Sequence, residues 1–148
     1  MAIALGSNVG DRDAHLAYAA ERLRTVLTAM RVSSFLETDP VGVGAQPRFL
    51  NAAVVGGATL PPRALLDELL RIEAERGRVR PGPGLPRTLD LDLILYGDAV
   101  IEEPGLVVPH PRFRGRGFVL VPLAEVAPEM VDPVTGLTAR DLLAALGP

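Results

Sequence analysis

Hydrophobic and polar residues alternate along 84–97 (GLPRTLDLDLILYG), a pattern typical of a half-buried strand, which we expect over 88–96. At a period of two, one face of this strand carries Leu89, Leu91, Leu93 and Leu95. The opposite face carries Thr88, Asp90, Asp92 and Ile94. The pattern therefore predicts a strand on which two like charges stand one strand repeat apart.

The same periodicities divide the rest of the chain into strands and helices. Short apolar runs predict strands over 2–6, 31–37 and 49–57. Helical spacing predicts a first helix that runs to about residue 29, capped by Asp11 or Asp13, with an apolar stripe of Leu16, Ala20, Leu23 and Leu27. A second helix is predicted within 60–77; it begins at Pro61 and Pro62 and ends at Gly77.

The resulting order of elements, β-α-β-β-α-β, indicates an α+β fold. We expect a ferredoxin-like antiparallel sheet with helices packed on one face. The remainder, 98–148, has a proline-rich stretch and a last helix over 138–146, which adds a C-terminal helical segment. A chain of 148 residues without an internal repeat or linker predicts a single domain over 1–148.

Composition narrows the class of protein. The net charge of −3 gives no general basic signature for nucleic acid, and the absence of cysteine excludes disulfides and thiolate chemistry. All 15 positive residues are arginine, which is typical of a GC-rich genome. No signal peptide and no apolar run of about 20 residues stands out, so we expect a cytoplasmic protein without membrane contact.

The paired aspartates suggest a metal site. Carboxylates at i and i+2 of a strand share a face about 6.6 Å apart. Asp90 and Asp92 repel each other there unless a cation or solvent separates them, and Mg²⁺ characteristically takes one or two carboxylates together with phosphate oxygens. The alternative is a solvated strand face at the edge of a sheet.

Arginines flank the aspartates in two groups, which the sequence places at Arg76, Arg78, Arg80 and Arg87, and at Arg112, Arg114 and Arg116. The planar guanidinium fork binds phosphate, so carboxylates for metal and arginines for phosphate together describe a polyphosphate site. No GxxxxGK[ST] loop is present, and ATP would be held by side chains and metal. Codon bias and solvated loops are the alternative explanation for these arginines.

Three further residues favour a flat heterocyclic ligand. Phe49 and Asn51 share a strand face, where an aromatic ring and an amide can stack on and hydrogen-bond a heterocycle, with Phe118 as a second ring. Core packing is the alternative for Phe49.

The two histidines differ in interpretation. His110, in VPHPR, either donates to a phosphate oxygen or has a structural role, and His15 is expected at the surface.

Six segments in this order cover nearly the whole chain: ALGSNVGDR, FLETDPVG, FLNAAV, IEAERGRVR, PRTLDLDLILYG and VPHPRFRGRGFVLVPLAEVAP. Together they closely resemble the 6-hydroxymethyl-7,8-dihydropterin pyrophosphokinase family of folate biosynthesis. The resemblance implies transfer of pyrophosphate from ATP to the hydroxymethyl group of the pterin, with release of AMP and with two Mg²⁺ ions. Three loops, GSNVGDR, TDPVGVGAQPR and RVRPGPGLPR, would surround the bound substrates, and the third would close over them.

The resemblance also implies roles for individual residues. Asp90 and Asp92 would bind the metal and act in catalysis with Arg78 and Arg87. The ATP-binding residues would be Glu73, Arg78, Arg80, Arg87, His110 and Arg116. The pterin-binding residues would be Thr38, Val41, Phe49, Asn51, Asp90 and Phe118.

A protein of another class has to be weighed against this enzyme. A ferredoxin-like binding module for RNA or a regulatory ligand would leave Asp90 and Asp92 merely solvated. Only 4% of residues are aromatic and the net charge is negative, which argues against RNA. We therefore expect a monomeric enzyme with no nucleic-acid partner.

Overall fold

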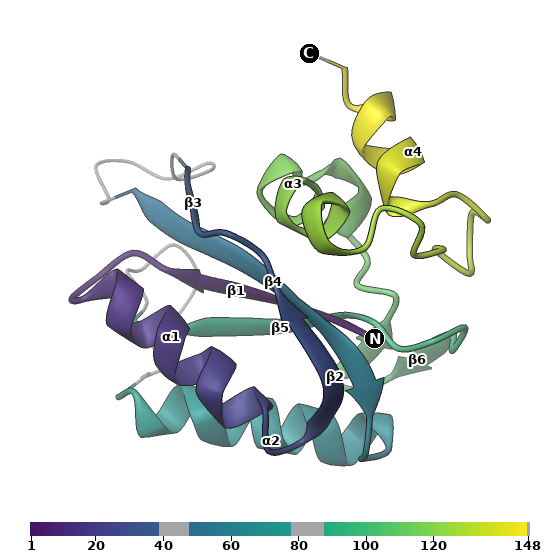
Figure 1. Ribbon diagram of the computed structural model, residues 1–148. Coiled ribbons are helices and arrows are strands. Elements are labelled where there is room, and N and C mark those ends of the chain that lie inside the picture. Colours follow the sequence, from purple (N-terminus) through teal and green to yellow (C-terminus); the bar gives the residue numbers. More distant parts are fainter. Residues whose placement is uncertain (39–47, 78–87, 148) are drawn as a thin grey trace.

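The computed structural model describes residues 1–38, 48–77 and 88–147, which form an antiparallel sheet between two layers of helices (Figure 1). The strands are β1 (Ala2–Ser7), β2 (Leu27–Val32), β3 (Leu36–Thr38), β4 (Phe49–Ala58), β5 (Asp90–Leu95), β6 (Ile101–Glu103) and β7 (Leu106–Val108). The helices are α1 (Arg12–Leu23), α2 (Pro62–Glu75), α3 (Gly117–Val126) and α4 (Ala139–Ala145), with a 3-10 turn η1 (Phe113–Gly115).

The order of strands in the main sheet is β2-β4-β1-β5, with β3 also paired to β4, and every pairing is antiparallel. This order places the first and third strands of a βαββαβ unit at the centre, so the ferredoxin-like prediction is confirmed. β6 and β7 form a separate two-stranded sheet. Among the described residues, no helix is both long and apolar enough to cross a bilayer.

The first helix ends earlier than its apolar spacing predicts. Asp11 caps it by accepting the Ala14 N–H at 3.1 Å, and the last helical residue is Leu23. The Thr25 hydroxyl donates to the Arg22 carbonyl at 2.7 Å, and the chain then enters β2 at Leu27. The prediction of a helix to residue 29 is wrong because Leu27, which fits the helical repeat, is buried as a strand residue instead.

The strand predicted over 31–37 is interrupted, and its two parts are β2 and β3. At the break, Ser33 exchanges hydrogen bonds with Ala53 of β4: its N–H donates to the Ala53 carbonyl and its Oγ accepts the Ala53 N–H, each at 2.9 Å. Ser34 donates from both N–H and Oγ to the Glu125 carboxylate of α3, at 2.7 and 2.5 Å. The interruption thus ties β3 to α3.

Helices cover both faces of the sheet, two on one face and α3 on part of the other (Figure 1). α1 and α2 pack on one face, with Leu16 and Leu69 against strand residues such as Leu91. α3 packs on the other face, with Leu120 and others against residues at one end of the sheet, and α4 packs against α3. The expectation of helices on one face holds for α1 and α2, while α3 covers part of the second face and α4 packs on α3.

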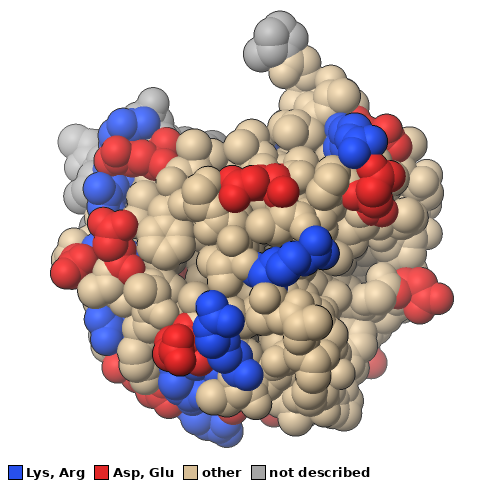
Figure 2. Space-filling model, viewed as in Figure 1, with Lys and Arg blue, Asp and Glu red and all other residues tan. Residues whose placement is uncertain are grey.

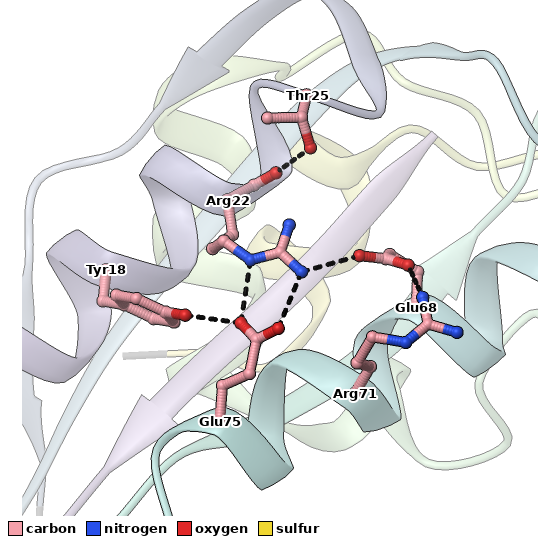
Figure 3. A network of polar contacts seen from close by, with 6 residues as sticks. All are labelled: Tyr18, Arg22, Thr25, Glu68, Arg71 and Glu75. Carbon is pink, nitrogen blue, oxygen red and sulfur yellow. Dashed lines mark hydrogen bonds and ion pairs between the residues drawn. The ribbon is translucent and has the colours of Figure 1, made fainter.

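A network of charged groups joins α1 to α2 on the outer side of the first layer (Figure 3). Arg22 donates to Glu75 from Nε at 2.8 Å and to Glu68 from Nη2 at 2.9 Å, and Arg71 also pairs with Glu68. The Tyr18 hydroxyl donates to Glu75 at 2.5 Å. These contacts fix the two helices side by side.

Other surface arginines also face carboxylates. Arg63 pairs with Glu103 at 3.0 Å and Arg140 with Glu129 at 2.6 Å. In Figure 2, basic and acidic side chains lie close together in small groups on the face shown. Much of the arginine content is therefore used in ordinary surface ion pairs, in line with a compositional origin.

The register of β5 contains one irregularity that changes the predicted face of a leucine. Ile3 pairs with Leu93 and Ala2 with Leu95, so Ile94 is skipped and the register shifts. Leu95 consequently packs with Ile94 on the α3 side, whereas simple alternation predicts the α1 side. Asp90 and Asp92 precede the shift and keep their expected face.

The C-terminal third differs most from the elements predicted from the sequence. The last helix is confirmed as α4, whose Thr138 and Asp141 form a reciprocal capping box. The β6–β7 hairpin and α3 are not predicted by the sequence pattern. α3 contains Pro122, which breaks the usual rule for helix interiors, and the segment is otherwise apolar enough to be buried against the sheet.

Candidate active site

Three residues from three adjacent strands form one row across the sheet. Gly6 of β1 lies opposite Asn51 of β4 on one side and opposite Asp90 of β5 on the other. Residues directly opposite in antiparallel strands share a face, so the Asn51 and Asp90 side chains flank a position without a side chain. A Cβ at Gly6 would lie 3.3 Å from Asn51 Oδ1 and 3.7 Å from Phe49 Cδ1.

The orientation of the Asn51 amide is fixed from the neighbouring strand. Its Nδ2 donates to Thr38 Oγ1 of β3 at 2.5 Å, and the side chain is buried. This leaves Oδ1, a hydrogen-bond acceptor, on the Gly6 side. Thr38 in turn lies opposite Phe49 in the β3–β4 pair. Three of the predicted pterin-binding residues are thus neighbours at one end of the sheet.

Asp90 and Asp92 are half-buried on β5, the strand at the edge of the main sheet. The described residues contain no cluster of three or more metal-ligating side chains. Two carboxylates on one face fit a Mg²⁺ ion that takes its remaining ligands from phosphate and water. A closed structural site, by contrast, needs a full set of protein ligands.

The outer edge of β5 is occupied by groups from outside the sheet. The Leu91 N–H donates to Oε2 of Glu73 on α2 at 2.7 Å. Further along, the His110 N–H donates to the Ile94 carbonyl at 2.9 Å. Glu73, for which the resemblance implies an ATP contact, is only 2% exposed.

His110 follows the cis peptide bond between Val108 and Pro109 and is held beside the aspartates by its bond to β5. Burial, with Arg116 and Arg112 adding to it, lowers the His110 pKa to about 4, although Asp90 acts in the opposite direction. Its Nδ1 accepts the Arg112 N–H at 3.1 Å. The ring is therefore neutral near pH 7 and carries its proton on Nε2, as a hydrogen-bond donor.

The described arginines divide between the site and the rest of the protein. Arg116 lies over the Phe118 ring, 5.5 Å from its centroid, at the start of α3. Arg114 instead binds Asp132, with Nε at 2.5 Å from Oδ2 and Nη2 at 3.0 Å from Oδ1. The arginines of the two clusters seen in the sequence therefore do not all serve as phosphate-binding residues.

Arg76, the first member of the arginine group that precedes the aspartates, contacts α1. Its Nε donates to His15 Nδ1 at 2.9 Å, and its guanidinium lies 4.7 Å from the centre of the Tyr18 ring. His15, expected at the surface, is half-buried by these contacts. Burial is the main cause of its lowered pKa, followed by the charge of Arg76.

Val41, Arg78, Arg80 and Arg87 lie outside the described residues, so their predicted roles stay predictions. The sequence indicates Gly6 only as the end of the first strand. Its place between Asn51 and Asp90 depends on the register of three strands, and no local signal in the sequence indicates it. Gly6 is the site residue that sequence reasoning missed.

The sequence matches one family throughout most of its length. The model of the family "7,8-dihydro-6-hydroxymethylpterin-pyrophosphokinase (HPPK)" matches residues 2–128. Over 135 residues the chain is 46% identical to the 2-amino-4-hydroxy-6-hydroxymethyldihydropteridine pyrophosphokinase of Bacillus subtilis, covering 90% of this chain and 81% of the relative. It is 44% identical over 148 residues to the protein of the same name from Methylorubrum extorquens, covering 99% and 92%.

The fold is similar to that of solved structures as well. A crystal structure of Plasmodium falciparum HPPK-DHPS superposes with a TM-score of 0.75 and 15% sequence identity, over 97% of this chain. The present chain spans 43% of that longer protein. At this level of identity the likeness shows the fold.

Proposed function

Because this chain belongs to the 7,8-dihydro-6-hydroxymethylpterin-pyrophosphokinase family, we propose that it transfers the pyrophosphoryl group of ATP to 6-hydroxymethyl-7,8-dihydropterin at the row formed by Asn51, Gly6 and Asp90. The reaction is a step of folate biosynthesis. The observation that carries the assignment to this row is the fixed Asn51 amide beside a position without a side chain, next to a carboxylate.

We place the pterin over Gly6, beside the Asn51 amide and between aromatic rings. Asn51 Oδ1 accepts a hydrogen bond from the heterocycle, and Phe49 and Phe118 contribute the aromatic faces. Thr38 and Val41 supply backbone contacts at the pterin edge. Asp90, at the other end of the row, then lies near the hydroxymethyl group.

The triphosphate binds on the β5 side of this row. Asp90 and Asp92 would hold Mg²⁺, and we expect two ions. Bound Mg²⁺ supplies charge neutralisation on the phosphate oxygens. The neutral His110 ring donates from Nε2 to a phosphate oxygen, and Arg116 adds positive charge beside Phe118. We expect Arg78, Arg80 and Arg87 to complete the ATP-binding set. Glu73, which the family resemblance also implies for that set, is buried.

The chemical step is a substitution at the β-phosphorus of ATP. The hydroxymethyl oxygen forms a new bond to the β-phosphorus. The bond from the β-phosphorus to the oxygen that bridges the α- and β-phosphates breaks. AMP leaves with that oxygen, and the hydroxyl proton is released. The side chains of the site contribute positioning and charge stabilisation. We further expect a cytoplasmic monomer in which residues 1–148 act as one pyrophosphokinase domain.

The first experiment is to measure AMP formation from ATP and Mg²⁺ with and without 6-hydroxymethyl-7,8-dihydropterin. The proposal requires AMP only when the pterin is present, together with the pterin diphosphate. A ferredoxin-like binding module would form no AMP under either condition. Absence of AMP with every divalent metal tested would overturn the proposed activity.

A further inference from the structure

A buried carboxylate contacts the backbone between the two aspartates. Leu91 separates Asp90 from Asp92, and its N–H points away from β1, toward α2. Glu73 Oε2 accepts this N–H at 2.7 Å, within the range of a well-formed N–H···O hydrogen bond. Glu73 is 2% exposed and Leu91 is 5% exposed, so little water competes for the bond.

This contact determines the direction of two side chains at once. On a strand, the side chains of i−1 and i+1 take their direction from the backbone around residue i. An edge strand lacks a neighbour to hold that backbone on its outer side. Glu73 supplies the missing acceptor from α2, a rigid helix anchored in the core by Leu69 and Ile72.

The burial of Glu73 also bears on its role in the reaction. A carboxylate is costly to bury, and an edge N–H could be left to solvent or covered by an apolar side chain. A residue that recognises ATP directly needs an accessible polar atom. Glu73 has its side chain turned into the protein with Oε2 committed to Leu91.

We propose that Glu73 is a positioning residue for the aspartate pair: it holds the Leu91 amide so that Asp90 and Asp92 present both carboxylates to the metal and phosphates. This inference rests on the proposed function. It gives Glu73 a different role from the ATP contact that the family resemblance implies. Carboxylates that orient metal ligands typically change metal affinity or activity about 10–100-fold when removed.

The test compares Glu73→Met, which keeps the length of the side chain and removes the oxygen acceptor, with Glu73→Gln, which keeps a neutral acceptor. Asp67→Asn, which alters an exposed carboxylate of the same helix, is the matched control. Each variant is assayed for kcat at saturating ATP, for KM of ATP, and for the Mg²⁺ concentration that gives half-maximal rate. The Leu91 amide is followed by ¹H–¹⁵N NMR.

For Glu73→Met we expect kcat at saturating ATP to fall about 10–100-fold and the half-maximal Mg²⁺ concentration to rise. KM of ATP stays as in the wild type, and the Leu91 amide proton moves upfield. Glu73→Gln falls between Met and wild type in kcat, and Asp67→Asn matches the wild type. A rise in KM of ATP with unchanged kcat would overturn the proposal and support a direct nucleotide contact.

If Glu73→Met does not fold, Glu73→Gln decides the question. An upfield shift of Leu91 with a higher Mg²⁺ requirement supports positioning, while an unchanged kcat and Mg²⁺ requirement overturns it. The two proposals fail in different ways. A wild-type protein that forms no AMP contradicts the proposed function, whereas an active wild type with unaffected Glu73 variants contradicts only the positioning role.

Discussion

Asn51 and Asp90 come from different strands and lie in one row of the sheet, on either side of a glycine. One presents a fixed amide oxygen and the other a carboxylate. α3 covers the far end of the same face, where the sheet residues are apolar. The fold thus leaves polar groups and a residue without a side chain at one end of a face that is otherwise core.

Adding a side chain at Gly6 is expected to weaken pterin binding selectively. In Gly6→Val the new Cβ would lie 3.3 Å from Asn51 Oδ1, inside the space assigned to the heterocycle. We expect KM of the pterin to rise about tenfold or more, equivalent to about 1.4 kcal/mol, with KM of ATP unchanged. Steady-state kinetics measure both constants. A thermal unfolding curve tests whether the β-branched side chain is tolerated in the strand. An unchanged pterin KM would place the pterin elsewhere.

Removing one aspartate is expected to stop turnover without unfolding the protein. Asp92 is half-buried on an edge strand, so Asp92→Ala leaves the core packing intact. We expect kcat to fall more than about 100-fold, the scale of losing one group that stabilises transition-state charge. Asp98→Ala, at an exposed position in the turn after β5, is the control and should keep full activity. Near wild-type turnover of Asp92→Ala would contradict the metal assignment.

Stability in the absence of substrates is expected to fall as the pH is lowered from about 6.5 to about 4. His110 has a pKa of about 4 in the folded protein against 6.5 in the unfolded chain. Between these values the unfolded chain binds more protons, so acidification favours unfolding. His15, whose pKa is also lowered, acts in the same direction.

Urea unfolding at pH 7 and pH 5 measures this effect. The midpoint should be lower at pH 5, and His110→Asn should reduce the difference between the two pH values. Equal midpoints for the wild type would show that His110 titrates normally. NMR titration of the ring then gives the pKa directly.

The buried ion pair in the C-terminal segment is expected to matter for stability. Asp132 has a fully buried side chain, and burial alone would raise its pKa. Hydrogen bonds from Arg114, Thr135 and Val134 outweigh burial and hold that pKa at about 2. Asp132→Ala leaves these donors without their acceptor, and we expect the free energy of unfolding to fall by about 3 kcal/mol.

Chemical denaturation of Asp132→Ala tests this value. Glu129→Ala is the control, because the Glu129–Arg140 pair is exposed on both sides and should contribute little. A similar loss of stability in both variants would indicate that burial of Asp132 is unimportant.

The order β-α-β-β-α-β up to β5 could be predicted because periods of 2 and 3.6 are strong over β5 and α2. Helix ends are also marked, by Asp11 as one of two candidate caps and by Pro62 and Gly77. The end of α1 could not, since Leu27 satisfies the helical repeat although it begins a strand. α3 was hidden by Pro122 and by its even hydrophobicity, which has little periodicity to detect.

The candidate site was predictable where residues near in sequence share a strand face, as Phe49 and Asn51 do, or Asp90 and Asp92. Contacts between one strand and another, or between a strand and a helix, could not be predicted in this way. The place of Gly6 depends on register, and the bond from Leu91 to Glu73 depends on how α2 packs against β5. Neither arrangement has a local signature in the sequence.

The occupied outer edge of β5 has a consequence for how this protein behaves at high concentration. A bare edge strand offers its amides and carbonyls to any other extended chain and so promotes sheet-to-sheet aggregation. Here a carboxylate from α2 takes the Leu91 amide and the His110 backbone takes the Ile94 carbonyl. Two backbone groups on the outer edge of the aspartate-bearing strand are thereby unavailable to an incoming strand, which lowers the tendency of the sheet to pair with another chain.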